Sequence, residues 1–455
     1  MQSDINEAVG RVVQEFAISP EKLYELVDEF KAEMQQGLER DTERGMPMIP
    51  TFVTKIPTGQ EKGTYLAADL GGTNFRVCSV NLKGNHTFSV KRESWKVPHD
   101  IQTGTSDKFF HFLATNVQEF IATHHDEHLR EEESNYRMGF TFSFPLLQKS
   151  INSGNLLRWT KGFDINDAVG ADIPALFQQA MDNLGLRIHI AAIVNDTVGT
   201  LMARSYANAD SSKTVLGCIF GTGTNGAYFE QVSMIEKFKG TCGGRTMAIN
   251  TEWGSFDNDL RVLPNSKYDQ EVDSLTSNKG FHMFEKRISG MFLGELLRVI
   301  LLDLHKQGLM FRDTESPQLE TPWCVDASVP SVIESILPEN LSRIGDILYK
   351  AFGVTSNERE QIAVRSLSRA IGLRSAYLSA VAIVGTLDHI RAFERFEKID
   401  IGGDGSVFEK YPHFERRVRE AVRILKGDDE ARVTFGMAHD GSGVGAALCA
   451  LEQGI

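Results

Sequence analysis

The sequence contains few cysteines, no excess of positive charge and no long hydrophobic run, and each absence excludes a class of protein. Its 455 residues carry a formal net charge of −13, which argues against a nucleic-acid-binding or anionic-membrane-binding surface. No apolar stretch approaches the length of a membrane span, and the N-terminal residues lack the basic and apolar regions of a signal peptide. We therefore expect a cytoplasmic protein that binds neither nucleic acid nor membrane.

The five cysteines, at positions 78, 218, 242, 324 and 449, are odd in number and form no C-x-x-C pair. Cys78 and Cys218 lie in apolar, strand-like segments, where free thiols commonly serve as small core residues. This usage fits a reducing compartment. A hydrophobic content of 41% and a charged content of 24% are ordinary for a globular protein, and the length favours two lobes over one core.

Glycine and short polar residues recur in two similar turns. The triplet Gly-Thr-Asn follows an apolar segment at positions 72–74 and again at 223–225, and strand-like sequence resumes after each copy. Both patterns predict strand–turn–strand hairpins. Glycines let the backbone fold tightly and expose consecutive N–H groups, which suits a phosphate chain, although two ordinary hairpin turns would show the same pattern.

Two familiar nucleotide-binding motifs do not fit the second turn. Gly221, Gly223 and Gly226 match the spacing G-x-G-x-x-G, which requires a helix to follow. Residues 227–232 are rich in aromatic and β-branched side chains and predict a strand instead. A Rossmann site is therefore disfavoured, and the sequence has no Gly-Lys-Ser/Thr ending of a P-loop.

The order of the predicted elements is that of an α/β protein. We expect helices over 3–38 and 105–135, three strands within 62–97, strands at 137–144 and 188–194, a helix over 196–208 and a hairpin over 214–234. The rest is predicted to be mostly helical to about residue 392, with a periodic stretch at 285–305. A strand at 397–401 precedes a glycine turn at 402–406, and a glycine-rich segment at 441–445 begins a last helix.

Asp196 is the candidate catalytic base. It stands where the predicted strand 188–194 ends and the next helix begins. Ligands of α/β sheets gather at such strand ends. An Asp or Asn at this junction is also the favoured helix cap, and for Asp196 taken alone the cap is the stronger interpretation.

Several polar residues stand among aromatic and glycine residues, which is unusual for a solvated face. They are Ser143, Thr160, Lys161, Glu252 and Glu285. Such residues could pair the hydroxyls of a polyhydroxylated ligand between aromatic walls. Each glutamate, taken individually, is more commonly a surface or salt-bridged carboxylate. His124 and His128 have the i, i+4 spacing of metal ligands, but their charged surroundings favour a solvated helix face.

Together these motifs resemble the hexokinase family, specifically its single-unit fungal glucokinase/hexokinase group. The matching segments are 66–76, 140–145, 158–163, 195–200, 219–225, 250–256, 284–295, 403–407 and 440–447, in family order over nearly the whole chain. The resemblance implies an α/β fold of the actin-like (ribonuclease H-like) sugar kinase type, with two lobes around a cleft. The small lobe would be 62–195, the large lobe 1–61 and 196–440, and helix 441–455 would pack at the hinge.

The resemblance also implies ATP-dependent phosphorylation of glucose at the 6-hydroxyl, the first step of glycolysis, with Mg²⁺, by a monomer or homodimer. Asp196 would accept the proton of that hydroxyl, and Lys161 would neutralise charge on the transferring phosphoryl group. The sugar-binding set would be Ser143, Phe144, Thr160, Lys161, Asn195, Asp196, Asn225, Glu252 and Glu285. ATP would be held by Asp69, Leu70, Gly71, Gly72, Thr73, Asn74, Arg76, Thr224, Ser406, Val407, Phe408, Glu409 and Lys410, with magnesium at Asp69.

Two positions depart from the family pattern. His282 stands where many hexokinases carry a glutamine near the sugar, and Met291 replaces a lysine that some relatives place near the nucleotide phosphates. Both choices resemble the fungal glucokinase branch and favour glucose as the substrate. The alternatives are a broad hexokinase that also takes mannose and fructose, and a sugar-sensing relative with little catalysis.

Overall fold

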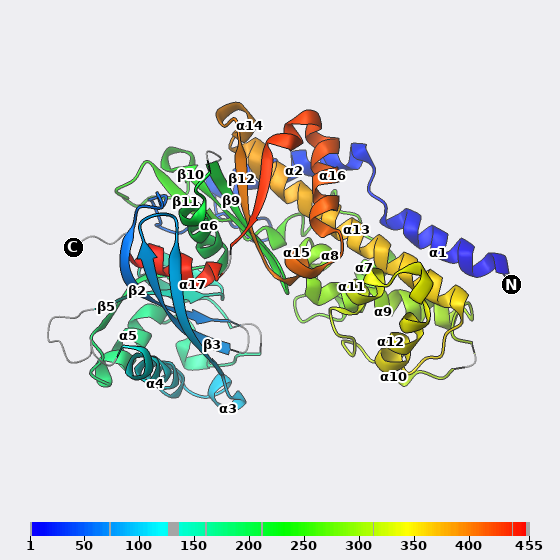
Figure 1. Ribbon diagram of the computed structural model, residues 1–455, viewed down its shortest axis with the longest axis horizontal. Helices are drawn as coiled ribbons and strands as arrows, with labels where there is room; N and C mark the ends of the chain where they lie inside the picture. The colour runs from blue at the N-terminus through cyan, green and yellow to red at the C-terminus, as the bar shows by residue number, and fades with distance from the viewer. Residues whose placement is uncertain are drawn as a thin grey trace.

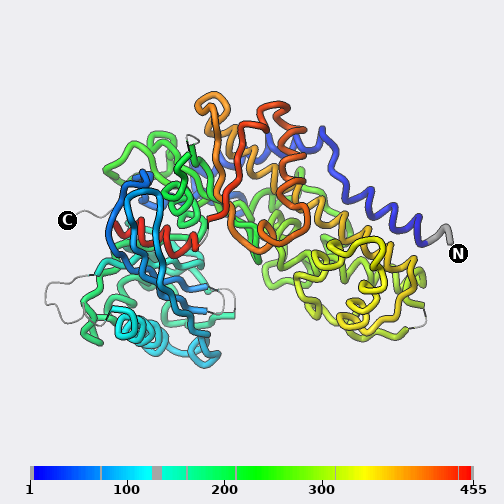
Figure 2. Tube along the Cα trace, viewed as in Figure 1, coloured from blue at the N-terminus to red at the C-terminus, as the bar shows by residue number. Residues whose placement is uncertain are grey.

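The computed structural model describes residues 2–71, 74–125, 136–159, 162–210, 213–312, 314–438 and 440–451. Figure 1 shows a β-rich half on the left, which contains α17, and a mostly helical half on the right, which contains α1. In Figure 2 the red C-terminal segment lies beside blue strands from the first part of the chain. Segments far apart in the sequence therefore meet within the β-rich half.

The first sheet has five strands in the order β4-β3-β2-β5-β8. Their bounds are β2 (Lys62–Leu70), β3 (Asn74–Lys83), β4 (Phe88–Lys96), β5 (Tyr136–Phe142) and β8 (Ile188–Val194). Strands β2 and β3 form the first predicted hairpin. Strands β2, β5 and β8 are parallel, so their carboxyl ends lie at one edge of the sheet.

Helices cover both faces of this sheet. On one face lie α3 (His99–Gln102), α4 (Ser106–His124) and α5 (Ile173–Asn183); on the other lie α6 (Asp196–Ala207) and α17 (Gly441–Leu451). Strand side chains alternate between faces. Leu66 and Ala68 of β2 accordingly enter the core shared with α4 and α5, while Ala67 enters the core shared with α6 and α17.

The second sheet has six strands in the order β1-β11-β10-β9-β12-β13. Their bounds are β1 (Ile49–Pro50), β9 (Lys213–Phe220), β10 (Thr224–Gln231), β11 (Thr246–Asn250), β12 (Ile399–Asp404) and β13 (Val433–Met437). Strands β9 and β10 form the second predicted hairpin, and β9, β12 and β13 are parallel. A separate pair, β6 (Leu146–Ser150) and β7 (Ser153–Leu156), completes the strands described.

The helical half is built from short helices around one long helix. It contains α1 (Gln2–Phe16), α2 (Pro20–Glu39), α7 (Lys267–Ser274), α8 (Glu285–Ile288), α9 (Gly290–Lys306), α10 (Pro317–Glu320), α11 (Val329–Ser335), α12 (Ser342–Phe352), α13 (Glu358–His389), α14 (Ala392–Arg395), α15 (Ser406–Lys410) and α16 (Phe414–Lys426). Ser19 caps α2 by accepting a hydrogen bond from the Lys22 amide at 3.2 Å.

Helix α13 corrects one expectation from the sequence. By length and composition its 32 residues could cross a membrane, so an apolar run of spanning length does exist in the chain. However, 89% of its most apolar window is buried inside the protein. The helix is surrounded by α1, α2, α11 and α16, and it is therefore a core helix of this fold.

Two predicted elements have different bounds in the structure. The periodic stretch 285–305 is two helices, because Ser289 has extended backbone angles (φ −84°, ψ 149°) and separates α8 from α9. The strand expected at 397–401 continues to Asp404 through two glycines. Gly402 is required there, since a Cβ on it would lie 2.7 Å from the Arg204 side chain. The sequence analysis also missed β11 and β13, whose pairing partners are distant in the sequence.

Helix α17 links the two sheets. It follows β13 of the second sheet and packs on β2, β5 and β8 of the first. Its contact with α6 is close, because a Cβ on Gly445 would lie 2.1 Å from the Gly199 carbonyl oxygen. The Thr141 hydroxyl at the end of β5 donates to the Ser442 carbonyl at 3.0 Å. The strand ends of both sheets are thereby tied to one helix.

Candidate active site

The carboxyl ends of the parallel strands bring together residues that are distant in the sequence. In the first sheet, Asp69 on β2 is in register with Thr141 on β5, and Thr141 is in register with Val194 on β8. Asp196 begins α6 directly after β8. Asp69 and Asp196, the two carboxylates with the most demanding predicted roles, therefore stand at the same edge of the sheet.

Asp196 is not the cap of α6, which corrects the interpretation favoured for this residue in isolation. The cap is Asn195, whose side-chain oxygen accepts a hydrogen bond from the Thr197 amide at 2.8 Å. Asp196 is the first helical residue, and its carboxylate accepts a hydrogen bond from the Thr197 hydroxyl at 3.2 Å. Since Asn195 satisfies the end of the helix, the Asp196 carboxylate is available for other chemistry.

A network of amides and one carboxylate joins Asn195, the residue before Asp196, to the second sheet. The Asn225 side-chain nitrogen lies 3.4 Å from the Asn195 oxygen, 2.7 Å from the Asn250 oxygen and 3.1 Å from Glu252 Oε1. Asn250 in turn donates to Glu252 Oε1 at 2.8 Å. Three of the predicted sugar-binding residues, Asn195, Asn225 and Glu252, are thus in direct contact.

Glu252 is held in an unusual conformation and environment. Its backbone is left-handed, with φ 51° and ψ 43°, and such strain in a non-glycine residue is often found at functional sites. Burial raises the pKa of the Glu252 carboxyl; the Asn250 hydrogen bond and the charge of His282 oppose the shift, and the charges of Asp196 and Glu285 add to it. Glu252 is thus half-buried, and its carboxylate is hydrogen-bonded to the side-chain amides of Asn225 and Asn250.

Glu285 is bound to the second glycine turn and to His282. Its Oε2 accepts a hydrogen bond from the Thr224 amide at 3.0 Å, and its Oε1 lies 3.5 Å from His282 Nδ1. Burial lowers the pKa of His282, but the hydrogen bond and charge of Glu285 together with the charge of Glu252 raise it more, so the pKa lies above its ordinary value. Gly223 leaves room for the carboxylate, since a Cβ there would lie 2.7 Å from Glu285 Oε2.

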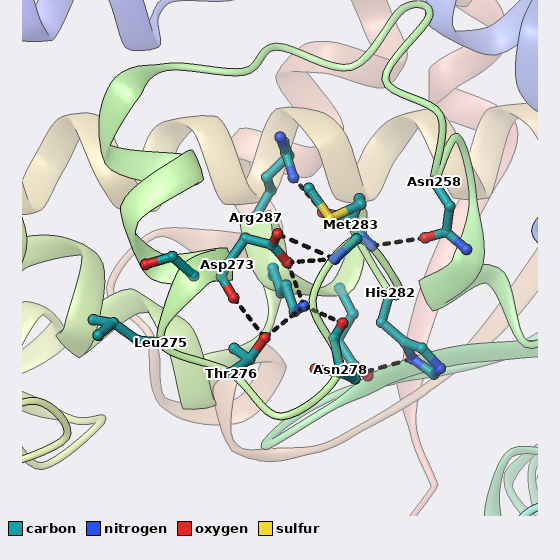
Figure 3. Close-up of polar contacts among 12 residues, drawn as sticks. Asn258, Asp273, Leu275, Thr276, Asn278, His282, Met283 and Arg287 are labelled. Atoms are coloured by element: carbon teal, nitrogen blue, oxygen red, sulfur yellow. Dashed lines mark hydrogen bonds and ion pairs between the residues drawn. The ribbon is translucent and has the colours of Figure 1, made fainter.

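A set of buried polar contacts fixes the loop that carries His282 and Glu285 (Figure 3). Lys286 Nζ donates to Asp273 at 2.6 Å, to the Thr276 hydroxyl at 2.9 Å and to the Asn278 carbonyl at 2.9 Å. The Asn258 side chain accepts a hydrogen bond from the Met283 amide at 3.0 Å. The sequence analysis missed these supporting residues and Asn250, because only their spatial partners reveal their roles.

The first glycine turn lies next to the start of α17. Asp69 Oδ2 accepts a hydrogen bond from the Ser442 hydroxyl at 2.9 Å and lies 3.6 Å from Arg76 Nη1, its partner across the hairpin. The Gly71 amide donates to the Asn74 carbonyl at 3.1 Å, which closes the turn. Leu70 is a core residue. Gly72 and Thr73, also predicted to contact the nucleotide, lie outside the described residues.

The second turn and α15 hold the remaining residues predicted for ATP. The Thr224 hydroxyl accepts a hydrogen bond from Trp253 Nε1 at 2.9 Å, so the Thr224 side chain is engaged at the start of β10 in the second sheet. Ser406 begins α15 after Gly405, whose φ of 103° favours glycine. Val407 and Phe408 are buried, with the Phe408 ring stacked on Phe220. Glu409 and Lys410 are exposed, and Lys410 Nζ lies 3.9 Å from Glu409 Oε2.

Some predicted residues occupy other surroundings or cannot be placed. Phe144 is buried in an aromatic cluster with Phe142, Trp159 and Phe163, so its ring belongs to the core, while Ser143 beside it is partly exposed. Thr160 and Lys161 lie outside the described residues. The exposed Met291 lies at the start of α9, where its amide donates to the Thr222 carbonyl at 3.3 Å.

The donor set around Asp69 fits a magnesium ion shared with phosphates. The described residues contain no group of three or more His, Cys, Asp or Glu side chains that could enclose a metal. Asp69 offers one carboxylate, with 14% of its side chain exposed, beside a turn suited to phosphates. Mg²⁺ commonly keeps several waters and binds through one or two carboxylates plus substrate phosphates, which agrees with this arrangement.

The fold and the site define a two-sheet α/β protein of the sugar kinase class. Two hexokinase family models match the chain, at residues 8–206 and 215–452. The chain is 44% identical to Glucokinase-1 of Saccharomyces cerevisiae, over 98% of this chain and 97% of that protein. It is 42% identical to the glucokinase of Aspergillus niger, over 99% and 98% of the two chains.

A solved structure gives the same result. The hexokinase from Schistosoma mansoni complexed with glucose superposes with a TM-score of 0.86 at 32% identity, covering 99% of both chains. The chain therefore belongs to the hexokinase family. The family resemblance and the actin-like sugar kinase fold expected from the sequence are confirmed.

Proposed function

We propose that this chain transfers the γ-phosphoryl group of ATP to the 6-hydroxyl of glucose, with Asp196 as the base. The observation that carries the proposal is the position of Asp196, which begins α6 at a strand end while Asn195 provides the cap. The carboxylate is therefore placed at the strand end to accept a proton, and it does not serve as the helix cap. Its neighbours in the amide–carboxylate network support a site for hydroxyl groups.

The sugar is proposed to bind along that network. The carboxylates of Glu252 and Glu285 accept hydrogen bonds from sugar hydroxyls, and Asn225 both donates and accepts. Glu285 already holds the second glycine turn through the Thr224 amide, so sugar binding is linked to the shape of that turn. Ser143, Thr160 and Lys161 are proposed to contact the sugar from the first lobe, with Lys161 also stabilising charge on the transferring group.

The phosphate chain is proposed to lie between the two glycine turns. Backbone amides of the turn at 71–74, together with Arg76, neutralise its charge. Asp69, whose carboxylate accepts a hydrogen bond from Ser442, would hold Mg²⁺, and the ion would supply charge stabilisation for phosphoryl transfer. Ser406 at the start of α15 faces the nucleoside end. Positioning and charge stabilisation account for most of the catalysis in phosphoryl transfer.

Closure of two lobes completes the proposal. We assign 62–195 to a small lobe and 1–61 with 196–440 to a large lobe, with α17 packing at the hinge. Closure excludes water that would otherwise compete with the sugar for the phosphoryl group. We place the enzyme in the cytoplasm, as a monomer or homodimer.

A steady-state panel of glucose, mannose, fructose and glucosamine with Mg-ATP tests the proposal through coupled ADP release. The ratio of kcat/KM values measures specificity, and we expect the highest value for glucose. Equal values for glucose and fructose would identify a broad hexokinase. Glucose binding without turnover would identify a sugar sensor and contradict the proposal.

A further inference from the structure

A small pocket in the helical half is lined mainly by arginine side chains. It has a volume of about 110 Å³ and lies among α11, α13 and the start of α16. Its lining residues are Glu334, Arg365, Arg369, His413, Arg416 and Arg417. None of them belongs to the sugar or nucleotide sites described above, so the inference below does not rest on the proposed function.

The single acidic residue of this pocket is already neutralised. Both guanidinium nitrogens of Arg417 contact the Glu334 carboxylate, one of them at 3.1 Å, and both residues are buried. Arg365 uses its Nε to donate to the Ile336 carbonyl at 2.8 Å. Within the described part of the chain, no ion pair joins Arg365, Arg369 or Arg416 to an acidic side chain. The pocket therefore holds three uncompensated positive charges in a protein whose formal net charge is −13.

Without an anion, the positions of these arginines carry a modest electrostatic cost, since Arg369 and Arg416 are exposed to solvent. Arg365 and Arg369 are four residues apart on α13, where like charges destabilise a helix. Arg416 lies in the first turn of α16, next to the positive end of the helix dipole. His413, which precedes α16, has a left-handed backbone with φ 61°. Like charges on α13, a cation at the start of α16 and a left-handed residue before it each depart from the usual preferences of a helix, and such departures are typical of a functional site.

The chemistry and the size of the pocket select the ligand. Guanidinium groups form paired hydrogen bonds with phosphate oxygens, and they are preferred where planar recognition of phosphate matters. A cavity needs about 10–15 Å³ by the same measure of volume to hold one water molecule, so a pocket of about 110 Å³ has room for a tetrahedral oxyanion. We infer that this pocket binds the phosphate group of a small anion, either free phosphate or a phosphorylated metabolite whose remainder extends into solvent.

The test measures phosphate binding by isothermal titration calorimetry on the full chain. The variant Arg369→Gln/Arg416→Gln removes two exposed pocket charges, and Lys239→Gln/Arg245→Gln removes two charges from the β10–β11 connection as a matched control. Because phosphate can also occupy the nucleotide site, the informative quantity is the difference between the two variants. Thermal unfolding followed by circular dichroism verifies that both variants are folded.

We expect the pocket variant to weaken one class of phosphate binding by at least about tenfold, since hydrogen bonds to charged groups are the strongest in proteins, and the control to leave it unchanged. Crystals soaked in selenate are expected to show anomalous density among Arg365, Arg369 and Arg416. Equal affinities of the two variants, or selenate found elsewhere but not in the pocket, would overturn the inference. Glucose 6-phosphate as a second titrant shows where the bound phosphate group comes from. If the wild-type protein binds glucose 6-phosphate more tightly than free phosphate and the pocket variant loses this difference, the ligand is a sugar phosphate. If the wild-type protein binds both with the same affinity, the ligand is free phosphate.

Discussion

Replacing Asp196 separates its proposed chemical role from the stability of α6. In Asp196→Asn the side-chain shape is kept but the base is lost, so we expect kcat to fall by about 10²–10⁴, the usual contribution of general base catalysis. That range corresponds to about 2.7–5.5 kcal/mol of transition-state stabilisation. The cap of α6 is unaffected, because the hydrogen bond from the Thr197 amide is accepted by Asn195 and not by Asp196. The unfolding free energy should therefore fall only by the helix-dipole contribution, about 0.3–1 kcal/mol.

Asn195→Ala is the matched comparison for this prediction. It removes the cap and should cost about 1 kcal/mol of stability, while the Asp196 carboxylate remains. Coupled ADP release with saturating glucose gives kcat, and urea unfolding gives the free energy of each variant. Near-normal turnover of Asp196→Asn would rule out Asp196 as the base, and a larger loss of stability than in Asn195→Ala would show that Asp196 supports the helix.

Three further predictions concern buried charges and helix contact. Burial raises the pKa of Glu33 from 4.5 to about 7. The stability that the protonated Glu33 contributes is therefore lost as the pH rises from 4.5 to about 7. Glu33→Gln should raise the unfolding free energy at pH 8 by about 1–3 kcal/mol and leave it unchanged at pH 4. Although burial opposes ionisation, Arg374 holds the pKa of Asp269 at about 2, below its ordinary 3.8. The stability that the ionised Asp269 contributes is therefore lost as the pH falls from 3.8 to about 2. Asp269→Asn should lower the unfolding free energy by about 3–5 kcal/mol at pH 7 and make it depend less on pH below about 4. Gly445→Ala should push α17 away from α6 and lower the melting temperature, whereas Gly10→Ala on α1, where a Cβ would meet nothing within 4 Å, should raise it slightly.

Local sequence patterns were sufficient for the elements that form the edges of the site. The two glycine hairpins and the strand at Ile188–Val194 were predicted because apolar runs and turn residues are local signals. The hexokinase motifs then located the fold and most of the candidate residues. By contrast, β13 has no distinctive local pattern, since its place in the sheet depends on pairing with β12.

The division of roles at the start of α6 required the structure. Asn195 and Asp196 are both favoured caps by residue type, and only the hydrogen bond to Thr197 distinguishes them. Likewise, no sequence signal indicates that Asn225 and Asn250 both donate hydrogen bonds to Glu252. The three side chains meet only because β10 pairs with β11 and because Glu252 has a left-handed backbone. Long-range contacts of this kind are invisible to periodicity and turn chemistry.

The central claim is that this chain phosphorylates the 6-hydroxyl of glucose. The most direct test is nuclear magnetic resonance of the product formed from ¹³C-labelled glucose and ATP. We expect one product, in which phosphorus couples to carbon 6, formed in equal amount with ADP. Phosphorylation at another position, or release of inorganic phosphate from ATP without a sugar phosphate, would contradict it.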